Sequence, residues 1–240
     1  MAPRARTTRR YAAHLVAACR TAPIQETLRS YLLNWSAEQR AAVEEVATDF
    51  WAAYHEVAAE VRPQAQVVGD RFHAQKHRND AVNTTRRAVQ RRMGAADREF
   101  VGARRNLFLR NEEDLYREEE LDLLLMKVYS PPLDEVHTRK EEFRTIYNTA
   151  QDRATAAEQV DTWLATVAQS TVTALVKAGA FVARWRESIL NYFAARTSSG
   201  MVEGLNNKIK LLKRMAFGSG NDSHFRLRVL MACEGRPLAH

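Results

Sequence analysis

Two acidic residues lie where a carboxylate could take part in phosphate chemistry. Asp70 ends the run Ala65–Asp70, "AQVVGD", which predicts a short buried strand. Functional groups commonly gather beyond the carboxyl ends of such strands. Glu203 lies near the start of the predicted helix in Ser199–Lys210, "SGMVEGLNNKIK". Because carboxylate oxygens suit divalent cations, both residues are candidate metal ligands. The simpler alternatives are a turn-forming aspartate and a glutamate that stabilises a helix dipole.

The helix that contains Glu203 is predicted to have one basic face. At about 100° per residue, the side chains that share the face of Glu203 are Asn206, Asn207, Lys210, Lys213 and Arg214. The apolar residues of the opposite face are Met201, Leu205, Ile209, Leu212 and Ala216. Arg226 and Arg228 follow a glycine-rich turn. These asparagines and cations are candidate DNA-binding residues, because such a face suits the phosphate backbone. A merely solvated charged face is the alternative.

His73 and His77 are four residues apart, which on a helix would place both imidazoles on one face. Such a pair can bind zinc, but no glutamate stands where the H-E-x-x-H pattern needs one. Lys76 and Arg78 would also repel a cation. We therefore expect no zinc in this chain and favour a packed or DNA-facing pair. His73 is accordingly a weaker DNA-binding candidate, as are Arg86 and Arg87 in the basic helix predicted over Asn79–Met93.

The bulk composition favours an anionic partner. The 240 residues carry a net charge of +7, with a pI near 9.6, and 45% of them are hydrophobic. This composition favours a folded domain that binds nucleic acid, with acidic lipid as a second choice. Cys19 and Cys233 are far apart and support neither a disulfide framework nor a structural zinc site.

The first 25 residues form a basic segment without a clear structure. Tyr11–Cys19, "YAAHLVAAC", resembles a lipoprotein signal. Its apolar stretch is short and contains His14, so the start of an amphipathic helix is favoured. No run reaches the roughly 18 apolar residues of a membrane span, and no membrane partner is expected.

The elements that must position these residues are mostly helical. Glu26–Ala59 has helical spacing with an interruption at Asn34–Ser36, where Ser36 suits a new helix start. Asn106–Leu109, "NLFL", is a second candidate strand, and Glu112–Tyr192 reads as helix with a turn at Pro131–Pro132. The fold class is therefore α/β and predominantly helical, with too few strands for a complete sheet.

Two segments resemble a known family, the insertion-sequence transposases of the ISL-three group. The first is "VVGDRFH" (67–73) followed by "KHRNDAVNTTRR" (76–87), and the second is "RTSSGMVEGLNNKIKLLKRMAFGSGNDSHFRLRVL" (196–230). The lead-in "VEEVATDFWAAYHEVAAEVRPQAQ" (43–66) is also similar. The resemblance covers about residues 27 to 232. Two ordered motifs around a helical block make it more specific than either motif alone.

The resemblance implies a ribonuclease-H-like fold interrupted by a large α-helical insertion. It also implies DNA cleavage and strand transfer by an Asp-Asp-Glu triad that holds two Mg²⁺ or Mn²⁺ ions. Asp70 would be the second acid and Glu203 the third. The expected divisions are a basic segment (1–25), a partial ribonuclease-H-like region (26–110), the insertion (111–195), the third-acid region (196–232) and a tail (233–240).

The chain departs from the family pattern at the first acid. That acid should lie on an early strand, downstream of a DNA-binding region, and neither is visible in residues 1 to 64. Asp49 matches a helix position of the lead-in and is not assigned to the role. The expectation is thus the C-terminal half of a transposase, inactive alone, whose partners are DNA and a second copy or the missing half. The expected location is the bacterial cytoplasm, at the nucleoid.

Two other functions stay open at this point. The chain could be a non-catalytic nucleic-acid-binding protein derived from a transposase, which keeps the basic helices and has lost the chemistry. It could also be a helical partner-binding remnant, although the basic composition speaks against that.

Overall fold

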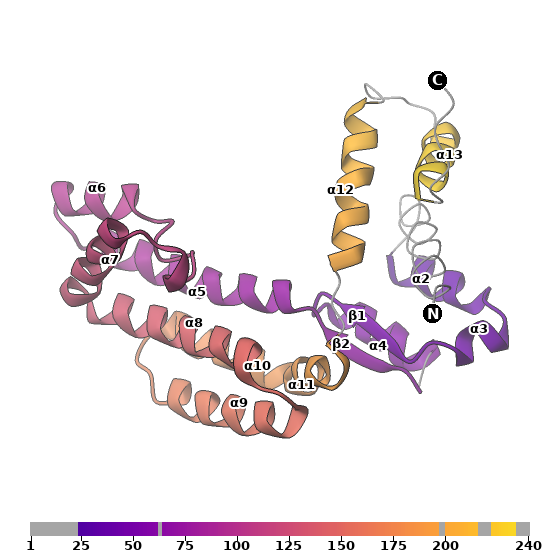
Figure 1. The fold of residues 1–240 in the computed structure, drawn as a ribbon, viewed down its shortest axis with the longest axis horizontal. Coiled ribbons are helices and arrows are strands. Elements are labelled where there is room, and N and C mark those ends of the chain that lie inside the picture. The colour runs from indigo at the N-terminus through magenta and orange to yellow at the C-terminus, as the bar shows by residue number, and fades with distance from the viewer. Residues whose placement is uncertain (1–23, 62–63, 197–199, 216–221, 234–240) are drawn as a thin grey trace. The chain divides into compact units, whose positions relative to one another are not determined.

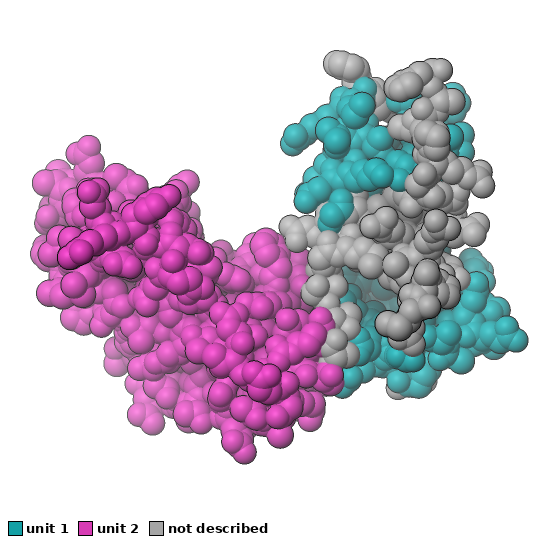
Figure 2. Space-filling view, viewed as in Figure 1, with its two compact units in different colours: residues 1–67, 197–240 teal, residues 68–196 magenta. Residues whose placement is uncertain are grey.

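A computed structural model describes residues 24–61, 64–196, 200–215 and 222–233. These residues are predominantly helical, with one small sheet, as the sequence predicts (Figure 1). The chain forms two compact units (Figure 2). Unit 1 comprises residues 1–67 and 197–240, and unit 2 comprises residues 68–196. None of the helices in the described ranges is both long and apolar enough to cross a membrane.

Unit 1 brings segments from both ends of the chain together. Its N-terminal elements are α2 (Ile24–Leu33), α3 (Ala37–Ala41), β1 (Glu45–Thr48), α4 (Ala52–Val61) and the start of β2 (Gln66–Gly69). Its C-terminal elements are α12 (Gly200–Met215) and α13 (Asp222–Cys233). β1 and β2 form a two-stranded sheet, in which the Gln66 N–H donates to the Glu44 carbonyl at 2.8 Å. α4 packs on α2, where the Arg29 guanidinium binds the Glu60 carboxylate at 2.8 Å.

The structure confirms one helix start and corrects one helix. Ser36 Oγ accepts from the Gln39 N–H at 3.1 Å, and Gln39 Oε1 accepts from the Ser36 N–H at 2.9 Å. This capping box begins α3, as predicted. The helix predicted through residues 45–48 is wrong, because these residues form β1 instead. Pairing with β2 satisfies their backbone groups, so a tertiary partner overrides the helical spacing of the apolar residues. The strand predicted at Ala65–Asp70 is confirmed as β2.

Unit 2 is a helical assembly built around one long helix, α5 (Arg71–Gln90). Its other helices are α6 (Ala95–Ala103), η1 (Glu112–Asp114), α7 (Arg117–Tyr129), α8 (Pro131–Thr149), α9 (Arg153–Ala168), α10 (Thr173–Arg184) and α11 (Arg186–Ala195). α5 packs along α8 and α10, and α9 packs on α8, α10 and α11. The buried interior includes Phe143, Tyr147, Trp163 and Leu190. Pro131 and Pro132 occupy the first helical positions of α8, where their missing N–H groups cost no intrahelical bond.

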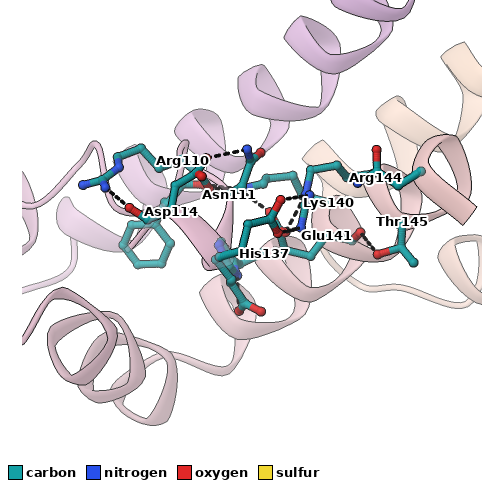
Figure 3. Close-up of polar contacts among 12 residues, drawn as sticks. Arg110, Asn111, Asp114, His137, Lys140, Glu141, Arg144 and Thr145 are labelled. Carbon is teal, nitrogen blue, oxygen red and sulfur yellow. Dashed lines mark hydrogen bonds and ion pairs between the residues drawn. The ribbon is translucent and has the colours of Figure 1, made fainter. Parts of the chain in front are cut away.

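The second strand predicted at Asn106–Leu109 is wrong, because this segment is a turn. Leu107 and Phe108 are buried without a strand partner. Lys140 of α8 holds the turn, since its Nζ donates to the carbonyls of Phe108 at 2.9 Å and Arg110 at 2.6 Å (Figure 3). A side-chain cation thus satisfies the backbone acceptors that a neighbouring strand would otherwise satisfy.

Candidate nucleic-acid and metal site

Asp70 stands between β2 and α5 in the described structure. Its backbone is extended (φ −67°, ψ 125°) and it is the N-cap residue of α5, but its side chain makes no capping hydrogen bond. The side chain is buried, with 3% of the residue exposed, and its Oδ2 lies 2.8 Å from His73 Nδ1. Among the described residues no hydrogen bond reaches Oδ1. A capping role therefore does not account for this carboxylate.

The helix that Asp70 begins carries two further charged side chains toward α8. The Arg71 guanidinium donates to Asn148 Oδ1 at 2.6 Å. Arg78 is 4% exposed and its guanidinium lies 4.6 Å from the centre of the Phe143 ring. Burial lowers the pKa of Arg78 to about 10, so it stays a cation at neutral pH. Burial also raises the pKa of Tyr147, the ring next to both arginines. The packing beside Asp70 is thus built from charged and aromatic groups.

The two histidines of α5 have different partners. His73 contacts Asp70, whereas the His77 ring stacks on Phe181 of α10, with centroids 3.9 Å apart and planes at 25°. Burial, ahead of the nearby charges, lowers the pKa of His77. The stacking of His77 on Phe181 agrees with the packed alternative for this histidine. Within the described ranges no three His, Cys, Asp or Glu side chains gather as a metal site would require.

α12 has the two faces that its sequence predicts. Ile209 and Leu212 pack in a small apolar cluster with Phe225, Val229 and Ala232 of α13. The exposed residues of the other face are Asn207, Lys210, Lys213 and Arg214. Glu203 belongs to the first turn of α12. The side chains of Glu203, Asn206, Met201 and Leu205, and all of Ala216, lie outside the described part of the structure.

One lysine of α12 has a structural role instead. Lys208 Nζ donates to the Ala232 carbonyl at 2.6 Å and so ties α12 to the last turn of α13. On α13, Arg228 is exposed, while the side chain of Arg226 lies outside the described residues. Among the described side chains, the predicted DNA-binding cations of α12 and α13 that are exposed are Lys210, Lys213, Arg214 and Arg228.

The weaker arginine candidates of α5 differ in exposure. Arg86 is buried, with 6% exposed, and its Nη1 donates to Gln90 Oε1. Desolvation lowers the pKa of Arg86. Arg87 is exposed. Of these two, only Arg87 is exposed to solvent, because Arg86 points into the helical packing of unit 2.

Asp49 is a further candidate acid. The sequence predicts a helix at this position, whereas in the structure Asp49 directly follows β1 and is exposed. The next residue, Phe50, is buried and has a positive φ of 58°, which turns the chain sharply into α4. The signal was present in the sequence: "VATD" ends in an acid after a short apolar run, as "VVGD" does before α5.

An open cavity of about 480 Å³ lies among η1, α7, α8 and α9. Its lining includes the carboxylates of Glu112, Glu141 and Glu142, and it does not include Asp70. Lys127 also lines the cavity, and Glu141 and Glu142 are both paired with neighbouring cations.

Comparison with known proteins gives relatives of one kind. A family model described as a transposase matches residues 6–229. The transposase for insertion sequence element IS1001 of Bordetella parapertussis is 29% identical, and the alignment covers 88% of this chain and 52% of that protein. The transposase for insertion sequence element IS1557 of Mycobacterium tuberculosis, from strains CDC 1551 / Oshkosh and H37Rv, is 25% identical and covers 80% of this chain and 48% of its own length. No solved structure matches significantly.

The chain spans about half the length of the curated relatives it matches. The family model, in contrast, covers most of this chain and includes β1, β2, the helices of unit 2 and α12. The chain therefore belongs to the ISL3-type insertion-sequence transposases.

Proposed function

We propose that this chain takes part in DNA cleavage and strand transfer of an insertion sequence, with α12 as a DNA-contacting helix and Asp70 and Glu203 as metal-binding acids. The observation that carries the proposal is the exposed basic face of α12 in a member of a transposase family. A ribonuclease-H-like fold interrupted by a helical insertion over residues 111–195 belongs to the same proposal.

α12 supports DNA binding because its apolar and basic faces are separated. Ile209 and Leu212 are used in packing on α13, which holds Lys210, Lys213 and Arg214 on the exposed side. Lysine and arginine at successive turns of one helix can each neutralise a phosphate. Asn207 adds an uncharged donor on the same side. These contacts fix position on a duplex rather than read its sequence.

Asp70 fits one ligand position of Mg²⁺ or Mn²⁺. Its Oδ2 accepts from His73, which orients the carboxylate, and Oδ1 has no hydrogen bond among the described residues. Hard oxygen donors of this kind are what these cations prefer. When bound, a metal pair supplies Lewis-acid activation of a water or strand-end hydroxyl at a phosphodiester. Glu203, one turn into α12, is the proposed second ligand from this chain.

The first acid of the triad decides whether the chain acts alone. We propose that a second polypeptide that carries the first acid completes the site, so that the chain by itself does not cut DNA. Asp49 is the alternative within this chain, because it directly follows a strand. A non-catalytic DNA-binding protein that keeps the basic face of α12 is the competing function.

Manganese binding tests these proposals without relying on cleavage. Mn²⁺ is titrated into the chain bound to a 30-base-pair duplex, and free Mn²⁺ is followed by electron paramagnetic resonance. We expect Asp70→Asn and Glu203→Gln each to weaken Mn²⁺ binding at least about tenfold, as for a lost carboxylate ligand. Glu158→Gln, an exposed acid of α9, is the matched control. Equal Mn²⁺ affinity in all four proteins would support the non-catalytic alternative.

The same titration with Asp49→Asn tests whether Asp49 is the first acid. A loss of Mn²⁺ affinity equal to that of Asp70→Asn would place the first acid in this chain and contradict the need for a partner. An unchanged affinity supports completion of the site by a second polypeptide.

A further inference from the structure

The outward face of α7 is apolar from Leu121 to Val128. Leu121, Leu124, Leu125 and Val128 are 55%, 55%, 61% and 75% exposed, and their spacing places them along one stripe. The opposite face of the same helix packs into unit 2 through Leu123 and Met126. Tyr116, just before α7, and Tyr129, its last residue, are also exposed, at the two ends of the stripe. These six side chains are defined here as the α7 stripe.

The α7 stripe is larger than the apolar patches that a monomer usually leaves in water. At roughly 200 Å² for each large side chain, the exposed fractions correspond to an area on the order of 700 Å². A typical monomer exposes no single apolar patch above about 300–600 Å². A specific interface buries about 800 Å² on each partner. The stripe alone thus offers most of what a stable complex requires.

The charges of α7 exclude nucleic acid as the occupant of the stripe. The helix has four acidic residues, Glu118, Glu119, Glu120 and Asp122, against Arg117 and Lys127. It is acidic in a chain whose net charge is +7. The exposed acids gather in the first turn, and no exposed charge interrupts the stripe from Leu121 to Val128. The α7 stripe is therefore suited to contact with an apolar protein surface.

We propose that the α7 stripe binds the α7 stripe of a second copy of this chain, with the two helices antiparallel. In this arrangement the residues near the two-fold axis are Leu124 and Leu125, and Leu121 of one copy packs on Val128 of the other. Parallel pairing would bring Glu118 and Glu120 of both copies together. Antiparallel pairing instead places each acidic first turn beside the last turn of the other copy, which contains Lys127 and no acid. It also places Arg117 near the partner's helix C-terminus, which attracts a cation.

This interface lies at a distance from Asp70 within unit 2. Asp70 precedes the first residue of α5, and α5 has 20 residues, which at 1.5 Å per residue spans about 30 Å. α6 follows α5, and α7 lies beside α6 at the far end of α5 in Figure 1. Substitutions on the α7 stripe can therefore test self-association without altering the surroundings of Asp70.

Sedimentation equilibrium of the full chain tests the proposal. We expect a concentration-dependent dimer, and Leu124→Glu with Leu125→Glu should raise its dissociation constant at least about 100-fold, because two charges enter the apolar centre of the interface. Leu33→Glu, at an exposed leucine of α2 with 53% exposure, is the matched control and should leave the dimer intact. Circular dichroism checks that each variant is folded. A wild-type chain that stays monomeric at 100 μM, or a double variant that still dimerises, would overturn the proposal.

Cysteine cross-linking tests the antiparallel orientation. In a Cys19→Ser, Cys233→Ser background, Leu125→Cys lies near the two-fold axis and should form a disulfide-linked dimer upon oxidation. Val128→Cys lies three residues away, so antiparallel pairing separates its two copies by about 10 Å and prevents the bond. A mixture of Leu121→Cys and Val128→Cys chains should form the mixed dimer. Equal self-cross-linking of Leu125→Cys and Val128→Cys would contradict the orientation.

Discussion

Lys140 is expected to be the side chain on which the Asn106–Arg110 turn depends most. Its ammonium group is buried, with 2% of the residue exposed, and donates to two backbone carbonyls. It also lies 2.7 Å from Glu141 Oε1. Desolvation, partly offset by Glu141, lowers the pKa of Lys140. Substitution Lys140→Met keeps the aliphatic length and removes both hydrogen bonds.

The expected loss follows from these contacts. Each carbonyl left without a donor costs about 1–3 kcal/mol, so the two together cost about 2–6 kcal/mol. Removing a buried cation recovers part of this, since Glu141 keeps the hydrogen bond from Arg144 Nε at 2.8 Å. We therefore expect Lys140→Met to lower the free energy of unfolding by about 2–4 kcal/mol.

Urea unfolding followed by circular dichroism at 222 nm measures this loss. The matched control is Arg139→Met, the preceding residue, whose guanidinium pairs with Glu142 at the surface. Its loss should be at most about 1 kcal/mol, as for an exposed ion pair. If Lys140→Met is no more destabilising than Arg139→Met, the two carbonyl contacts do not stabilise the turn and the reasoning is refuted.

Two further predictions concern unit 2. His137 is fully buried, and this burial, more than the nearby lysines, lowers its pKa to about 3. Neither ring nitrogen is hydrogen-bonded, although Nδ1 lies 3.5 Å from Glu112 Oε1. Below pH 6.5 the unfolded chain binds a proton that the folded chain does not, so stability should fall as the pH falls toward 3, by up to about 1.4 kcal/mol per pH unit. His137→Leu should remove this slope in urea titrations between pH 6.5 and 4.5; equal slopes in both proteins would show that His137 titrates normally. A Cβ on Gly179 would lie 2.7 Å from Val167 Cγ1, so Gly179→Ala should destabilise by about 1–3 kcal/mol despite the better helix propensity of alanine. Gly204→Ala, whose Cβ meets nothing within 4 Å, is the control and should stabilise slightly; a Gly179→Ala protein with an unchanged midpoint would mean that α9 and α10 separate easily.

The sequence predicts the local features better than the segments that depend on distant partners. The strand before Asp70, the Ser36 cap and the two faces of α12 follow from short-range patterns, and the structure confirms them in the residues it describes. β1 was missed because its residues also fit helical spacing and only the pairing with β2 decides between the two. The "NLFL" run was misjudged because its acceptor groups are satisfied by Lys140, which lies some thirty residues later in the chain.

The same limit applies to the site. Motif and helix phase identify Asp70 and the basic face of α12, but they do not distinguish Arg86 from Arg87, because both occur in one basic run. Packing against the other helices of unit 2 buries Arg86 and leaves Arg87 exposed. Asp49 was not assigned as an acid of the site because the sequence predicts a helix there. The wrong helix thus hid the position of Asp49 directly after a strand.

The exposure of the α7 stripe is also a feature that the sequence pattern does not predict. The sequence predicts a helix over Glu112–Tyr192, and its leucines at helical spacing do not show which of them are buried. In the structure Leu123 and Met126 are buried, and the stripe faces outward. Spacing identifies a face but does not say whether the same chain covers it.

Binding of duplex DNA as a function of salt tests the central claim most directly. Fluorescence anisotropy would give the association constant of the chain for a 30-base-pair duplex between 50 and 250 mM KCl. If Lys210, Lys213 and Arg214 each contact a phosphate, replacing all three by glutamine should reduce the slope of log K against log salt by about 3. Replacing Arg153, Lys177 and Arg184, which are exposed cations of unit 2, removes the same charge and should leave the slope nearly unchanged. Equal slopes for the two triple variants, or no DNA binding at 50 mM KCl, would contradict the assignment of α12 as the DNA-contacting helix.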